Sequence, residues 1–72
     1  MSELRKLLEH EKLEIKTSYN TMLAIDYLNL ALEQIERQVI NKEPIKQHIQ
    51  AILELKSLLI KAVKEKMVQE VR

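Results

Sequence analysis

The sequence predicts an all-α protein that forms a single domain over residues 1–72. Glycine is absent and Pro44 is the only proline, which excludes most β-hairpin turns and phosphate-binding loops. Good helix formers dominate the composition, and apolar residues recur with a period near 3.6. We therefore expect an antiparallel helical hairpin with a long helix at about 3–40, a turn at 41–43 and a second helix at 44–71.

The first expected helix follows Ser2, a residue type suited to the N-cap. Apolar side chains then recur in phase for about ten turns. In chain order they are Leu4, Leu8, Ile15, Tyr19, Met22, Ile25, Leu28, Leu32, Ile35 and Val39. The stretch 17–21 has middling to poor helix propensity, so a three-helix bundle with a break near 17–20 stays open as the alternative. A continuous helix is favoured because no glycine or proline enforces a stop there.

The residues from Asn41 to Pro44 predict the turn between the two helices. Asn41 suits a left-handed position after a helix, and Lys42 lies near the negative end of the helix dipole. Pro44 disfavours helical backbone at Glu43 and suits the first turn of the next helix. The chain is expected to reverse direction here.

The second expected helix carries a broad apolar face. Its members are Ile45, Ile49, Ile52, Leu53, Leu59, Ile60, Val63, Met67 and Val71, flanked by Leu55, Leu58 and Ala62. Folded back antiparallel, it places residues opposite each other when their numbers sum to about 85. Ile25 then faces Ile60, and the polar residues nearest the seam, Asn29 and Lys56, also face each other. Such a matched polar pair is typical of a device that fixes the register.

Charge is unevenly distributed along the chain, although the overall net charge is only +1. Residues 22–43 carry a net −2, from Arg37 and Lys42 against Asp26, Glu33, Glu36 and Glu43. Residues 44–72 carry a net +3, from Lys46, Lys56, Lys61, Lys64, Lys66 and Arg72 against Glu54, Glu65 and Glu70. Complementary charge contributes little energy at a surface but favours pairing of these two segments.

The hairpin is expected to be incomplete on its own. From Met22 to Leu32, nine of eleven residues are apolar, and they do not form one stripe. Leu23, Tyr27 and Leu30 are expected to point away from Met22, Ile25 and Leu32 and so away from the second helix. A helix that is apolar on most sides is normally packed against other elements on most sides. Two hairpins joined as a homodimeric four-helix bundle would supply them. The expected interface residues are Met22, Leu23, Ile25, Tyr27, Leu28, Leu30, Leu32, Ile52, Leu55 and Leu59.

No motif for catalysis, metal or cofactor binding is found, and the expectation is a protein that is not an enzyme. The two histidines, His10 and His48, lack the Glu-x-x-His repeats of bundle di-metal sites and are expected to be solvated. No serine or threonine has the signature of a paired base, and no glycine-rich turn could hold an oxyanion.

The leading functional hypothesis is a small regulatory or adaptor protein that binds an unknown protein partner. No apolar run approaches the roughly 18 residues of a membrane span, and cysteine is absent, so a cytoplasmic protein without membrane contact is expected. The alternative is a dimeric nucleic-acid-binding protein that uses a basic ridge of Lys56, Lys61, Lys64, Lys66 and Arg72. The outline resembles small helical-hairpin dimers such as plasmid copy-control RNA binders and sporulation checkpoint inhibitors, with no shared motif.

Overall fold

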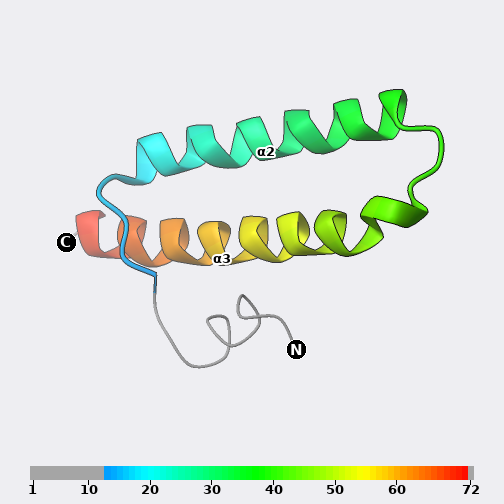
Figure 1. Ribbon diagram of the computed structural model, residues 1–72. Coiled ribbons are helices and arrows are strands. Elements are labelled where there is room, and N and C mark those ends of the chain that lie inside the picture. Colours follow the sequence, from blue (N-terminus) through cyan, green and yellow to red (C-terminus); the bar gives the residue numbers. More distant parts are fainter. Residues whose placement is uncertain (1–12, 72) are drawn as a thin grey trace.

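The computed structural model describes residues 13–71 of the chain, and the side chains of residues 13–70. Its elements are α2 (Ser18–Gln38), a short 3-10 helix η1 (Glu43–Ile45) and α3 (Lys46–Val71). Helices α2 and α3 lie side by side and run in opposite directions (Figure 1), so the predicted antiparallel hairpin is confirmed. Over this part of the chain there is no strand, and neither helix is long and apolar enough to cross a membrane.

Helix α2 begins at Ser18 because Thr17 caps it. The Thr17 Oγ1 atom accepts a hydrogen bond from the backbone N–H of Asn20, with an N···O distance of 3.2 Å. Thr17 has extended backbone (φ −138°, ψ 143°), and its carbonyl accepts a hydrogen bond from the Thr21 hydroxyl at 2.7 Å. The expected continuous helix over 3–40 is therefore wrong here, because the cap at Thr17 and the weak helix propensity of residues 17–21 both favour a helix start at this point. A break near 17–20, the alternative, is what the chain adopts.

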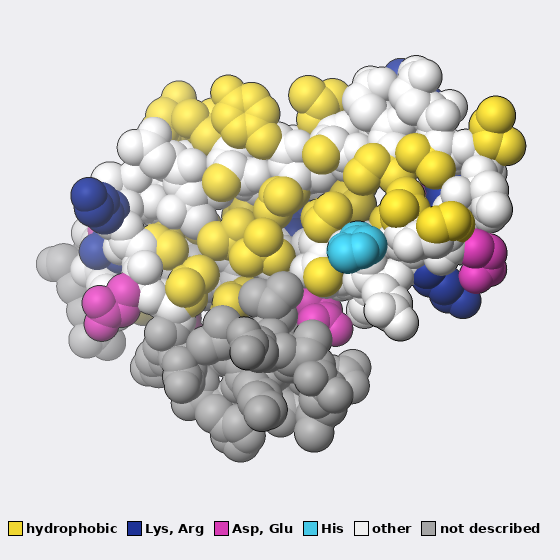
Figure 2. Space-filling model, in the orientation of Figure 1, with side chains coloured by type: hydrophobic (Ala, Val, Ile, Leu, Met, Phe, Trp, Pro, Cys, Tyr) yellow, Lys and Arg dark blue, Asp and Glu magenta, His cyan; other side chains and the backbone are white. Residues whose placement is uncertain are grey.

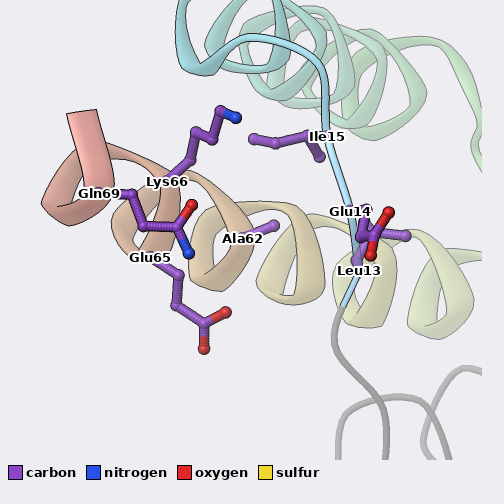
Figure 3. Close-up of a pocket in the computed structure, with 7 residues that line it drawn as sticks. All are labelled: Leu13, Glu14, Ile15, Ala62, Glu65, Lys66 and Gln69. Carbon is purple, nitrogen blue, oxygen red and sulfur yellow. The ribbon is translucent and has the colours of Figure 1, made fainter.

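Residues 13–17 are not helical and run across α3 (Figure 1). Leu13 and Ile15 are half-buried and line an open hollow beside Ala62 (Figure 3). This segment gives α3 a second neighbour besides α2. Whether residues 3–12 form the third helix of the alternative lies outside the described residues.

Helix α2 ends at Gln38, two residues before the expected end at Ile40. No described residue has a positive φ, so the prediction that Asn41 adopts a left-handed conformation is wrong. Asn41 instead uses its side chain, because its Oδ1 atom accepts a hydrogen bond from the backbone N–H of Glu43 at 3.1 Å. A side-chain oxygen bonded two residues ahead stabilises a turn without left-handed backbone.

Lys42 satisfies the carbonyl groups that the end of α2 leaves open. Its Nζ atom donates to the carbonyl oxygens of Val39 at 2.9 Å and Glu36 at 3.3 Å. The positive charge also lies at the negative end of the helix dipole, as predicted. Pro44 occupies the first turn of η1, where Ile45 N–H donates to the Lys42 carbonyl at 3.1 Å, and α3 follows directly.

The register of the hairpin is the predicted one. Lys56 Nζ donates a hydrogen bond to Asn29 Oδ1 at 3.0 Å, so the two polar residues that were expected to face each other do so. Ile25 and Ile60 line the same small cavity between the helices. The apolar pattern and the matched polar pair therefore indicated the correct alignment of α2 on α3.

The buried core lies on α3. Its members are Leu58, Ala62 and Val63, and Leu58 is only 3% exposed. Val63 belongs to the face that packs on α2, whereas Ala62 lies on the side crossed by residues 13–17 (Figure 3). Helix α2 has no fully buried residue. The two helices therefore differ in how completely they are covered.

Candidate interaction surface on helix α2

The inner face of α2 contacts α3 and is half-buried. Its large apolar residues follow the spacing of three and four residues that places side chains on one side of a helix: Ile25, Leu28, Leu32 and Ile35. Each buries part of its surface against α3, and each apolar side chain that is buried completely contributes about 1.5–3 kcal/mol. This face holds the hairpin together, but one neighbouring helix is too few to bury it fully.

A second set of apolar side chains lies on the opposite side of α2, and we call it the outer stripe. Tyr19 is 70% exposed, Leu23 37%, Tyr27 69% and Leu30 52%. The spacing of these residues places them within about 80° of one another on the helix, roughly opposite the inner face. Figure 2 shows hydrophobic side chains along the outer edge of the molecule over α2.

Tyr19 corrects the sequence analysis, which placed it on the stripe that faces α3. That stripe assumed one helix running in phase from Ile15 through Tyr19 to Met22. Because α2 begins at Ser18, Ile15 belongs to the non-helical segment, and the phase of α2 is set by Ile25 and the residues after it. Tyr19 and Met22 consequently turn away from the centre of the seam.

The charged residues of α2 are confined to one side of the helix. There are four of them: Asp26, Glu33, Glu36 and Arg37. At about 100° per residue they fall within an arc of roughly 100°. The remaining part of the circumference, which we call the uncharged arc, spans about 260° and includes the inner face, the outer stripe and the exposed Ala24 and Ala31.

Ion pairs strengthen the distinction between the two sides. Glu33 Oε1 and Arg37 Nη2 lie 2.9 Å apart, and Glu36 Oε2 and Lys42 Nζ lie 3.7 Å apart. All four side chains are at least one-third exposed, so these pairs contribute little stability. These pairs lie on the solvated side of α2. On the uncharged arc the only polar side chains are amides and hydroxyls.

The two helices also differ in net charge. Helix α2 carries a net −2, from Arg37 against Asp26, Glu33 and Glu36. Helix α3 carries a net +2, from Lys46, Lys56, Lys61, Lys64 and Lys66 against Glu54, Glu65 and Glu70. The complementary sign that the sequence analysis expected between these helices is therefore present in the hairpin.

The structure divides the residues of the predicted interface into three groups. Leu23, Tyr27 and Leu30 belong to the outer stripe and face away from α3, as expected. The inner face holds three more, the half-buried Ile25, Leu28 and Leu32. Four residues lie beside the seam: the exposed Met22 on α2 and the half-buried Ile52, Leu55 and Leu59 on α3.

The predicted basic ridge is not one surface. Lys61 and Lys64 are exposed, one turn apart on α3. Lys56 donates to Asn29, and Lys66 lines the hollow beside residues 13–15 (Figure 3). Lys61 and Lys66 are separated by about 140° around the helix axis. Arg72 lies outside the described residues.

No arrangement of side chains in residues 13–70 indicates catalysis. No group of three or more potential metal ligands is present over this range. His48 is exposed, and His10 lies outside the described residues. The Ser18 hydroxyl donates to Glu70 Oε2 at 3.0 Å, a contact that joins the start of α2 to the end of α3.

One exposed residue was missed by the sequence analysis. Ile40 is 99% exposed at the hairpin turn, where the expected helix would still have continued. No signal in the sequence separates it from the preceding apolar positions, because the end of α2 depends on the contacts of Lys42.

Comparison of the chain with protein-family models, with curated proteins and with solved structures finds no match. A function can therefore be proposed only from the surface of the hairpin itself.

Proposed function

We propose that this chain is a non-enzymatic interaction protein that self-associates through the uncharged arc of α2 into a four-helix bundle. The observation that carries the proposal is the outer stripe, four large apolar side chains on the side of α2 that faces away from its only described helical neighbour. A surface helix of a soluble protein normally presents charged or polar residues on that side. An exposed apolar patch of this kind is typical of a protein interface.

The composition of the outer stripe suits an interface that is covered and uncovered reversibly. Tyr19 and Tyr27 each combine a large apolar ring with a hydroxyl group that can remain hydrated at the rim. Leu23 and Leu30 supply apolar area without a polar group. Tyrosine is enriched at the centres of protein interfaces because it buries much area while losing little conformational freedom.

In this proposal the bundle acts as a small regulator or adaptor. Self-association covers the uncharged arc and leaves the polar sides of both hairpins exposed to a further partner. Ile40 at the turn is then a candidate anchor for that partner, because an isolated apolar side chain can enter a pocket of another protein.

The double variant Leu23→Asp with Leu30→Asp tests the proposal. Each aspartate would place a charge in the contact, so the dissociation constant should rise by at least a hundredfold. Helicity measured by circular dichroism should be retained because both positions are exposed in the hairpin. Sedimentation velocity over a concentration series gives the association constant.

A matched control distinguishes the surface of α2 from apolar surface in general. Val68 on α3 is 62% exposed and lies away from α2. Val68→Asp makes the same chemical change and should leave association unaltered. If both aspartate variants weaken association equally, or if neither does, the uncharged arc is not the interface.

Nucleic-acid binding is the second candidate, and it is now limited to Lys61 and Lys64 among the described bases. Phosphate contacts by these two residues would give binding that falls steeply as salt is raised. A gel shift with duplex DNA and with structured RNA at low salt separates the two candidates. A shift that Lys61→Glu with Lys64→Glu abolishes would favour this second function.

A further inference from the structure

We infer that the occupant of the uncharged arc is a second copy of this chain whose α3 packs against α2, with both hairpin turns at the same end of the bundle. The inference rests on the proposed self-association and adds to it the orientation of the two copies. In this arrangement each α2 packs against its own α3 through the inner face and against the α3 of the second copy through the adjoining part of the uncharged arc. The symmetry axis then runs parallel to the helices.

Charge complementarity supports the pairing of α2 with α3 of the second copy. Helix α2 carries a net −2 and helix α3 a net +2, so packing α2 on the second copy's α3 brings opposite net charges together. Packing α2 on α2 would bring together two helices of the same sign. Such charge patterns contribute less to affinity than to the choice between possible pairings.

The position of Asp26 argues against an antiparallel contact between the two α2 helices. If two α2 helices packed antiparallel with their outer stripes in register, Leu23 would face Tyr27 or Asp26 of the second copy. The two Asp26 carboxylates would then lie on the same side of the contact and within about one helical turn of each other. Two like charges at the edge of an apolar contact are destabilising. Placing α3 of the second copy against α2 avoids this meeting.

Two further features of α2 suit a neighbouring helix on this side. Ala24 and Ala31 are exposed, lie on the uncharged arc two turns apart, and leave room for close approach of another helix. The hydrophobic surface in Figure 2 continues from the outer edge of α2 down to the boundary with α3. With a second α3 in place, both neighbours of α2 are antiparallel to it, which also pairs the helix dipoles favourably.

Distances between spin labels on the two copies test the orientation. The chain contains no cysteine, so Gln50→Cys and Ser57→Cys each introduce one labelling site without changing the net charge. Both positions are exposed and lie two turns apart on nearly the same line of α3, on the side away from α2. Labelled full-length chains, first shown to be dimers by sedimentation, are measured by dipolar EPR spectroscopy.

The expected result is nearly equal distances between copies at the two positions, because an axis parallel to the helices keeps equivalent residues at the same height. With the turns at opposite ends, the height difference between equivalent residues would be about 20 Å larger for Gln50 than for Ser57. A Gln50 distance that exceeds the Ser57 distance by on the order of 10 Å overturns the orientation and leaves self-association standing. A monomer in the sedimentation step would instead overturn the proposed function itself.

Discussion

Helices α2 and α3 have similar composition but very different surroundings. Helix α3 is contacted by α2 on one side and crossed by residues 13–17 on another, and it contains the three buried residues of the described core. Helix α2 has α3 as its one helical neighbour in the described chain and contains no buried residue. The described part of the chain therefore covers α3 more completely than α2.

The side of each helix that faces away from its partner shows that this difference is a property of the sequence. On α3 that side carries Gln50, Ser57 and Lys61, which suit contact with water. On α2 the corresponding side carries the outer stripe. This side is therefore polar on α3 and apolar on α2, and the proposed self-association would cover the apolar one.

The largest expected effect is on the core of α3. Leu58→Ala should lower the free energy of unfolding by about 2–5 kcal/mol, because it removes most of a buried side chain and leaves a cavity. Leu53→Ala, at an exposed position of the same helix, is the matched control and should have a clearly smaller effect. Urea unfolding at one fixed chain concentration measures both. Equal losses would contradict the assignment of the core to this part of α3.

A smaller effect is expected at the start of α2. Thr17→Ala removes the side-chain oxygen that accepts from Asn20 N–H and should cost about 1 kcal/mol. Thr17→Ser retains a hydroxyl at the same position and should restore most of that stability. The same unfolding measurement compares the two variants. A loss that serine does not recover would show that the methyl group, and not the cap, matters here.

The smallest effect is expected at the polar pair between the helices. The coupling free energy of Asn29 and Lys56 should be about 0.5 kcal/mol, at the low end for a hydrogen bond, because the contact is exposed. A double-mutant cycle with Asn29→Ala and Lys56→Met isolates it. A coupling free energy of zero would show that this hydrogen bond forms in the observed register without stabilising the hairpin.

The hairpin, its turn and its register could be predicted from the sequence. The apolar residues of the two segments align in essentially one way, and the pairing of Asn29 with Lys56 agrees with that alignment. Pro44 and Lys42 indicated where the chain turns because each acts through local backbone chemistry. Local signals and long-range packing therefore pointed to the same fold.

The break before α2 was predicted only as the alternative, for a physical reason. Ile15 and Tyr19 are spaced as on one helix, so the apolar pattern continues through a capped helix start that interrupts the backbone. Thr17 is a residue type that favours an N-cap over a helix interior, but the absence of glycine and proline and the unbroken apolar spacing favoured a continuous helix. The same misjudged phase placed Tyr19 on the inner face.

The surface of α2 was foreseen in part. The prediction that Leu23, Tyr27 and Leu30 face away from α3 is confirmed by their exposure. The basic ridge was grouped from nearness in sequence alone, and rotation about the helix separates Lys56 and Lys66 from Lys61 and Lys64. A count of the charged residues around α2 would have shown the uncharged arc directly.

The mass of the full-length chain in solution tests the central claim most directly. Sedimentation equilibrium at micromolar concentrations should give about twice the chain mass of 8.5 kDa, with a monomer fraction that grows on dilution. A single species of 8.5 kDa across the concentration range would contradict the claim that a second copy covers the uncharged arc of α2.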